Sequence, residues 1–218
     1  LGDVVAEVEK LLADYPASDG VDLEVGGTVE DQGDAFGDLG TLLILIVILV
    51  YIVMATQFES LKFPFIIMFT IPFAFTGVFL ALWMTSTPLS LIALIGAIML
   101  VGIVTKNGIV MVDYMNLLIE RGSGVFDAVI AGGKSRLRPV LMTSFTTILG
   151  MLPLAIGTGA GSETWQPMGI AVIGGLTCST LLTLFIIPAL YSVFVNRSQR
   201  KEKEKLARLS AEHQASVH

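Results

Sequence analysis

Five long apolar stretches limit what this chain can fold into. A helix needs about 20 mostly apolar residues to cross roughly 30 Å of hydrocarbon. One stretch could be a buried helix of a soluble protein, but five in succession predict an all-α polytopic membrane protein. We predict membrane spans at about residues 39–58, 63–84, 89–114, 139–157 and 168–195.

The composition excludes several other classes of protein. Of the 218 residues, 54% are hydrophobic and 15% are charged, whereas a soluble domain has about 45–50% and 25%. A disordered chain, a nucleic-acid-binding module and an ordinary soluble enzyme are therefore excluded. The expected surroundings are a lipid bilayer, with no nucleic acid as a partner. The one cysteine, Cys178, cannot form an internal disulfide.

The basic residues predict how the chain is oriented. The connections between spans alternate between the two faces of the membrane. The segments on the face that receives the N-terminus carry one basic residue, Lys10, whereas those on the other face carry eleven, six of them in the tail 197–218. Because basic residues gather on the cytoplasmic side, we predict that the N-terminus lies outside and that the tail lies in the cytoplasm.

The first 37 residues do not have the pattern of a membrane span. Helical spacing of apolar residues predicts an amphipathic helix over 2–14, and alternation predicts a short strand over 21–25. One helix and one strand cannot bury a core of their own, and no signal peptide is present in this segment. We therefore expect a short α+β remnant of a larger external domain at 1–37, followed by the five-helix domain at 38–196.

The third span contains a lysine that has no nearby acid. A lysine at the centre of a span costs about 2.5–3.5 kcal/mol on insertion scales. Lys106 is followed by Asn107, and Asp113 is seven residues away along the helix, too far for a direct ion pair. Lys106 could extend towards the cytoplasm, or it could pair with an acid from outside this chain and take part in proton or ion movement.

The fourth span begins with basic residues and continues with hydroxyl side chains. Pro64 and Pro139 are expected in the first turns of their helices, where a missing N–H is harmless. Arg136 precedes the span, and Thr143 and Thr147 share one helix face. These hydroxyls could line a hydrated path or could bond back to their own helix.

The fifth span carries small residues at every fourth position: Ala171, Gly175, Ser179 and Thr183. Small residues let another helix approach closely. We interpret this stripe as a packing surface and not as part of a transport path.

No catalytic constellation is evident. The only histidines, His213 and His218, lie in the tail, and Asp113 is the one acid inside a span. The sequence therefore predicts a protein that is not an enzyme, with no catalytic residue, no metal site and no bound cofactor.

Several segments resemble a known family. The carrying segments are FESLKFPFIIMFTIPFAFTGV, ALIGAIMLVGIVTKNGIVMVDYMN, SRLRPVLMTSFTTILGMLPLAIGTGAGSE and FIIPALYSVF. They resemble the C-terminal membrane half of a resistance-nodulation-division (RND) efflux transporter, most closely the hydrophobe/amphiphile multidrug branch. The resemblance covers about residues 38–196, and residues 1–37 resemble the end of the periplasmic porter domain.

The resemblance implies a function and a set of partners. Such proteins are proton-driven exporters of the inner membrane of Gram-negative-type bacteria, and the five spans would be the eighth to twelfth of twelve. They work as homotrimers with a periplasmic adaptor (membrane fusion) protein and an outer-membrane channel, and the proton-motive force is their energy source.

The same resemblance implies a proton relay. In the family, two aspartates in the fourth span pair with a lysine in the tenth. Lys106 matches that lysine, Asn107 follows it as expected, and Arg136 and Thr143 match relay positions in the next span. The two aspartates are not in this chain.

Two other functions stay open. The cargo could be heavy-metal ions, lipids or a translocating polypeptide instead of amphiphilic small molecules, although the methionines of the spans form no clear ladder for a metal. The chain could also be a five-span scaffold without transport activity, but an unpaired Lys106 favours transport.

Overall fold

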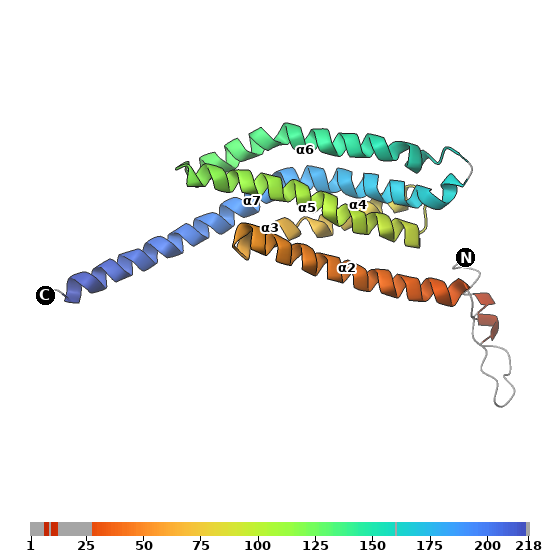
Figure 1. Ribbon diagram of the computed structural model, residues 1–218, viewed down its shortest axis with the longest axis horizontal. Coiled ribbons are helices and arrows are strands. Elements are labelled where there is room, and N and C mark those ends of the chain that lie inside the picture. Colours follow the sequence, from red (N-terminus) through yellow and green to blue (C-terminus); the bar gives the residue numbers. More distant parts are fainter. Residues whose placement is uncertain (1–6, 9, 13–27, 160, 217–218) are drawn as a thin grey trace, which may run out of the picture. The chain divides into compact units, whose positions relative to one another are not determined.

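The computed structural model describes residues 7, 8, 10–12, 28–159 and 161–216, and their side chains except those of 28–30 and 196–216. Residues 7, 8 and 10–12 are helical, within the helix predicted over 2–14, and the strand predicted over 21–25 lies outside the described residues. The helices are α2 (Thr28–Phe58), α3 (Lys62–Met68), α4 (Ile71–Met84), α5 (Leu91–Glu120), α6 (Val125–Ile156) and α7 (Ser162–Ser216) (Figure 1). The described residues contain no strand.

The chain divides into two units, Leu1–Leu45 and Ile46–His218. Of the first unit, the structure describes the helical residues near the N-terminus and the first part of α2. There the Thr41 hydroxyl donates a hydrogen bond of 3.0 Å to the Gly37 carbonyl.

Within the described residues, five helical segments are long and apolar enough to cross a membrane, so the prediction of an all-α protein with five membrane spans is confirmed. Their bounds are Asp31–Phe58, Lys62–Met84, Leu91–Glu120, Val125–Ile156 and Ser162–Val195.

The prediction that Pro139 begins a helix is wrong. Helix α6 begins at Val125 after an extended Gly124, and Pro139 lies inside it. The residues before Pro139 include alanine, lysine and arginine, which favour a helix, so the helix starts before the apolar segment does. At its other end α6 stops at Gly157, whose φ of 72° is left-handed.

The second span is broken in its interior, between α3 and α4. At the break the Thr70 hydroxyl and the Thr70 N–H both donate to the Ile67 carbonyl, over 2.7 and 3.0 Å. Pro72 follows in the first turn of α4. Proline has no N–H, so it cannot give the Met68 carbonyl the bond that an unbroken helix would supply.

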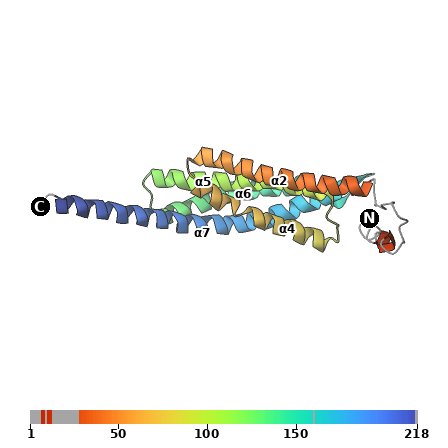
Figure 2. The ribbon, with the colours of Figure 1, turned by 90° about the horizontal axis from the view of Figure 1, so that it is seen from below.

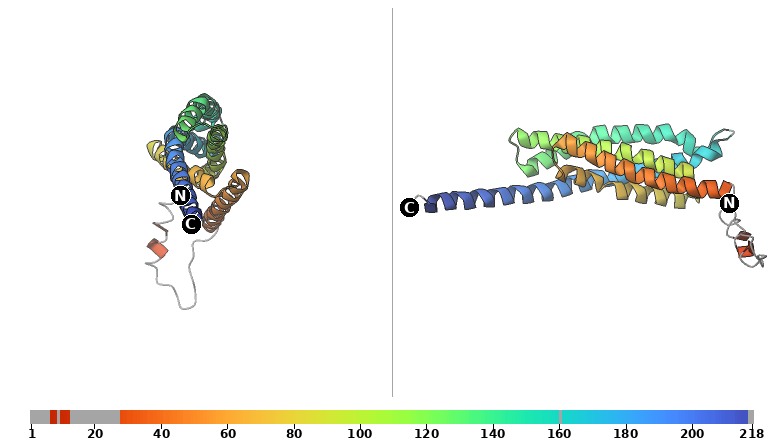
Figure 3. Two further views of the ribbon diagram at one scale, coloured as in Figure 1. Left: turned by 90° about the vertical axis from the view of Figure 1, so that its left-hand side faces the viewer. Right: turned by 60° about the horizontal axis from the view of Figure 1, so that its bottom comes forward.

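Helix α7 is the centre of the bundle. It packs against α4, α5 and α6 (Figures 1 and 3), and it runs as one helix to Ser216 (Figure 2). Glycines allow a close approach between α4 and α7. A Cβ at Gly77 would lie 2.6 Å from the Gly174 carbonyl oxygen, and one at Gly174 would collide with the Ala81 Cβ.

The buried side chains form two apolar clusters with a polar layer between them. One cluster ends at Val104 on α5 and Leu176 on α7. The other begins at Met111 on α5 and Ile187 on α7. Five of the six buried polar side chains of the described residues lie in the sequence intervals between the clusters, and the sixth, Ser144 of α6, bonds to Thr180. We call these six the hydroxyl layer: Thr70, Thr105, Ser144, Ser179, Thr180 and Thr183.

Candidate functional site

Lys106 lies at the middle of α5 on the exposed side of the helix. Ser90 begins this helix, and its side chain accepts a hydrogen bond of 3.2 Å from the Ala93 N–H. Lys106 and Gly102, one turn earlier, are exposed, whereas Thr105 is buried. Among the described side chains, Lys106 forms no hydrogen bond and no ion pair. The described side chains therefore provide no counter-ion for this cation at mid-span.

Asn107 lies next to Lys106 and is half-buried. After it, the side of α5 that meets the bundle turns apolar again. A Cβ at Gly108 would lie 2.8 Å from Ile67 and 3.1 Å from Ile187. The polar segment Thr105–Asn107 at the middle of α5 thus lies between apolar contacts.

Arg136 joins α6 to α5. Its guanidinium carbon lies 4.6 Å from the centre of the Tyr114 ring, a cation–π geometry. The Arg136 Nε is buried and has no hydrogen-bond partner among the described residues. The aromatic face thus holds this cation while one of its donors stays unused.

Thr143 lies on the exposed side of α6. Its hydroxyl donates to the Val140 carbonyl over 3.0 Å, and the Thr147 hydroxyl donates to the Thr143 carbonyl over 2.9 Å. Both hydroxyls therefore bond back to their own helix. Among the described side chains, no hydrogen bond joins Thr143 or Arg136 to Lys106.

The small-residue stripe on α7 faces α4 and α5. Ala171, Gly175, Ser179 and Thr183 are all buried. A Cβ at Gly175 would collide with Leu100 of α5 and would lie 2.8 Å from Val78 of α4. The stripe thus lies at a helix interface. Sequence reasoning did not identify which helices would meet it, because small residues are compatible with any close neighbour.

Sequence reasoning also missed a hydrogen bond between spans. The Ser144 and Thr180 hydroxyls lie 2.9 Å apart and are buried between α6 and α7. The available signal was a serine next to Thr143 and a threonine next to Ser179, but neither residue indicates its partner on another helix.

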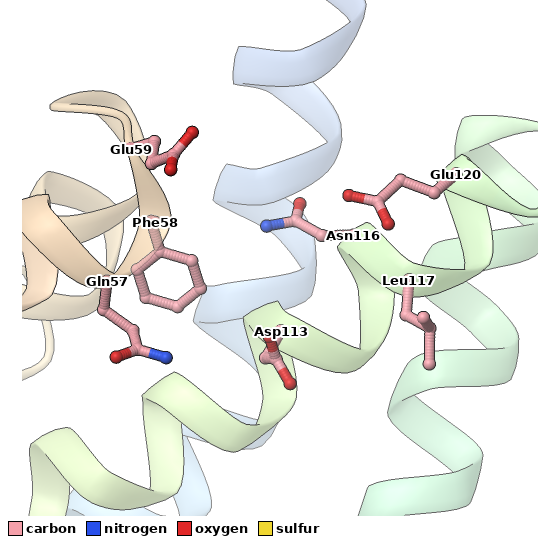
Figure 4. A pocket seen from close by; sticks show the side chains of 7 residues that line it. All are labelled: Gln57, Phe58, Glu59, Asp113, Asn116, Leu117 and Glu120. Atoms are coloured by element: carbon pink, nitrogen blue, oxygen red, sulfur yellow. The ribbon is translucent and has the colours of Figure 1, made fainter.

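An acidic pocket opens where α2 and α5 end (Figure 4). It has a volume of about 300 Å³, and its lining includes Glu59 from the turn after α2 and Asp113 and Glu120 from α5. Asn116 also lines it and accepts a hydrogen bond from the Tyr191 hydroxyl of α7. Within the described ranges, no three His, Cys, Asp or Glu side chains gather as a metal-binding group.

The fold and the candidate site define the class of protein: a multi-pass membrane protein with charged and hydroxyl groups at the middle of its spans. Comparison with known proteins gives the family. The model of the AcrB/AcrD/AcrF family matches residues 1–195. The chain belongs to this family of RND transporters, and the predicted resemblance is confirmed.

Relatives with different names are about equally similar to this chain. The swarming motility protein SwrC of Bacillus subtilis is 37% identical over 91% of this chain and 19% of its own length. The cobalt-zinc-cadmium resistance protein CzcA of Cupriavidus metallidurans is 38% identical over 82% of this chain and 16% of its own. The multidrug resistance protein MdtC of Yersinia enterocolitica is 38% identical over 96% of this chain and 20% of its own length.

A solved structure has the same fold. The crystal structure of a heavy metal efflux pump matches with a TM-score of 0.76 and 30% identity, over 90% of this chain and 19% of that one. This chain thus spans about a fifth of the length of the proteins it matches.

Proposed function

We propose that this chain is the C-terminal membrane part of a proton-driven efflux transporter that exports amphiphilic small molecules. The observation that carries the proposal is the position of Lys106, exposed at the middle of α5 with no counter-ion among the described side chains. Ionisable residues inside a membrane are costly and are usually functional.

The proposed relay works through pairing of charges. Carboxylates from a helix outside this chain would face Lys106 and stay ionised beside its ammonium group. When they take up protons, the attraction is lost, the lysine is released and the helices change their relative positions. Repeating this cycle couples proton entry to alternating access. Gly102, one turn from Lys106 and equally exposed, leaves room for a helix to approach.

Arg136 and Thr143 have supporting roles in this proposal, and so does Asn107. Arg136 holds α6 against α5 through Tyr114, so movement of α5 would be passed to α6. Asn107 adjoins Lys106 on α5 and is half-buried, and Thr143 lies on the exposed side of α6; both are assigned to the relay as polar groups.

The methionines favour an amphiphilic cargo over a metal ion. Met54 and Met111 are fully buried in one apolar cluster. Met99 and Met142 are exposed, on α5 and α6 respectively. This distribution suits packing and lipid contact, since a metal path needs several sulfur atoms along one channel. Metal export is the alternative function, favoured by the similarity to CzcA and to the solved heavy metal efflux pump.

The family also suggests the surroundings of the protein. We propose a homotrimer in the inner membrane that contacts a periplasmic adaptor and an outer-membrane channel. The predicted orientation places the C-terminal tail in the cytoplasm. The proton-motive force would drive export without a bound cofactor.

Substitution of Lys106 tests the proposal in the protein at its natural length. Lys106→Ala should abolish proton-driven efflux of a fluorescent amphiphile from proteoliposomes while expression and assembly are retained. The matched control is Lys134→Ala, which removes an exposed lysine of α6 and should leave efflux unchanged. Efflux at the normal rate in the Lys106→Ala variant would refute the relay, and lack of proton-coupled transport in the unmodified protein would favour a scaffold.

A further inference from the structure

The hydroxyl of Thr183 is buried in the bundle without a partner. Thr183 is 2% exposed, and its Oγ1 finds no hydrogen-bond partner among the described residues. Threonine in a helix usually bonds back to a carbonyl three or four residues earlier. Thr105, Thr143, Thr147 and Thr177 do so here. In hydrocarbon an unpaired polar group costs several kcal/mol, so we expect the Thr183 hydroxyl to have a hydrogen-bond partner.

The position of Thr183 on α7 shows which way it faces. Gly175 and Ile187, eight residues before it and four after it, lie on the same helix stripe. Gly175 packs against Leu100 of α5, and Ile187 packs against Gly108 of α5. Gly175 also approaches Val78 of α4, and Gly108 also approaches Ile67 of α3. Thr183 therefore faces the interval between these contacts, which contains Thr105 of α5 and the break between α3 and α4.

The neighbouring hydroxyls of the layer have acceptor capacity to spare. The Thr105 hydroxyl donates to the Val101 carbonyl over 2.8 Å, and the Ser179 hydroxyl donates to the Leu176 carbonyl over 3.2 Å. Each oxygen has used its hydrogen and keeps its lone pairs. One water molecule supplies what is missing, because it can accept from Thr183 and donate to the two other oxygens. Buried waters typically make about three such bonds.

The break between α3 and α4 adds a further polar group in the same interval. Thr70 belongs to the hydroxyl layer, and the nearby Met68 carbonyl receives no bond from Pro72, which has no N–H. Phe69 and Thr70 keep right-handed helical dihedrals, so the Met68 carbonyl, and not an irregular backbone, is the polar group that the break adds.

We propose that the hydroxyl layer holds an internal water molecule between α5 and α7, bound by Thr183, Thr105 and Ser179. The water gives α5 a hydrated inner side directly behind Lys106. It does not depend on the proposed export function, because it follows from the buried hydroxyls alone.

The sign of one stability change tests the proposal. Thr183→Val keeps nearly the same shape and replaces the hydroxyl with a methyl group. If the water is bound, the substitution removes one of its partners and lowers the melting temperature of the natural-length protein in detergent. If the site is dry, the substitution removes an unpaired polar group and leaves the melting temperature equal or higher, which would overturn the proposal. The control is Thr177→Val, because the Thr177 hydroxyl is exposed and bonds to its own helix; its melting temperature should stay unchanged.

Two further measurements keep the test decisive if Thr183→Val does not fold. In a high-resolution density map of the unmodified protein, a water peak about 3 Å from the Thr183 Oγ1 supports the proposal, and an empty site overturns it. For variants that fold, Thr105→Val combined with Thr183→Val should give non-additive shifts, because both residues bind the same water. Additive shifts would contradict a shared site.

Discussion

The close approach of α4 and α7 makes Gly77 sensitive to a single methyl group. A Cβ at this position would lie 2.5 Å from the Cys178 Cβ and 2.6 Å from the Gly174 carbonyl oxygen. Carbon atoms in good contact lie about 3.5–4.0 Å apart, so Gly77→Ala requires a shift of about 1 Å. The Gly174 oxygen belongs to the backbone and cannot rotate away, so the two helices must separate.

The expected loss of stability follows from that clash. Overpacking of a well-packed core costs about 1–3 kcal/mol. At an open helical position the same change gains about 1 kcal/mol, because alanine favours a helix more than glycine does. Gly102 provides the matched control, because a Cβ there meets nothing within 4 Å. This gain applies to both variants, so they should differ by the cost of the clash alone, about 1–3 kcal/mol in free energy of unfolding.

The measurement is thermal unfolding of the chain in detergent, followed by circular dichroism. For a chain of this size the difference corresponds to roughly 2–12 °C in melting temperature, with Gly77→Ala below Gly102→Ala and Gly102→Ala at or above the unmodified protein. Equal melting temperatures for the two variants would show that α4 and α7 do not approach as closely as described.

Two further substitutions test contacts between helices. Ser144→Ala leaves the buried Thr180 hydroxyl without its partner and should lower the free energy of unfolding by about 1–2 kcal/mol. Adding Thr180→Val should restore part of that stability, and a double variant less stable than Ser144→Ala would contradict the contact. Tyr191→Phe removes the bond to the Asn116 side chain and should cost about 1 kcal/mol in the same unfolding measurement; an unchanged value would show that the bond does not link α5 to α7.

Part of the candidate site was available from the sequence. Lys106 stood out because a charge in an apolar run has few explanations, and the small residues on α7 predicted a close helix neighbour. Whether Lys106 takes part in a relay remains a prediction that the efflux experiment tests. The acids proposed to face it are not in this chain, so its structure could not supply them.

The limits of the helices were harder to predict than their existence. Hydropathy marks the apolar part of a span, but a helix continues wherever its backbone bonds remain favourable. The sequence predicted that helix α6 begins at Pro139, but the helix begins 14 residues earlier, at Val125. The break between α3 and α4 involves Thr70 and Pro72, whereas Pro153 and Pro188 lie within unbroken helices. A proline alone thus does not predict a break.

The sequence by itself determined that this is a five-span helical membrane protein. In hydrocarbon the backbone groups of a span must bond within their own helix, so the length and apolarity of a segment suffice to identify a membrane-spanning helix. Only the tertiary structure decided which side of each span is buried. In a membrane the outer face is as apolar as the core, so the pattern of apolar residues does not distinguish them. The exposure of Lys106, the burial of Thr183 and the pairing of Ser144 with Thr180 depend on contacts between helices far apart in the chain.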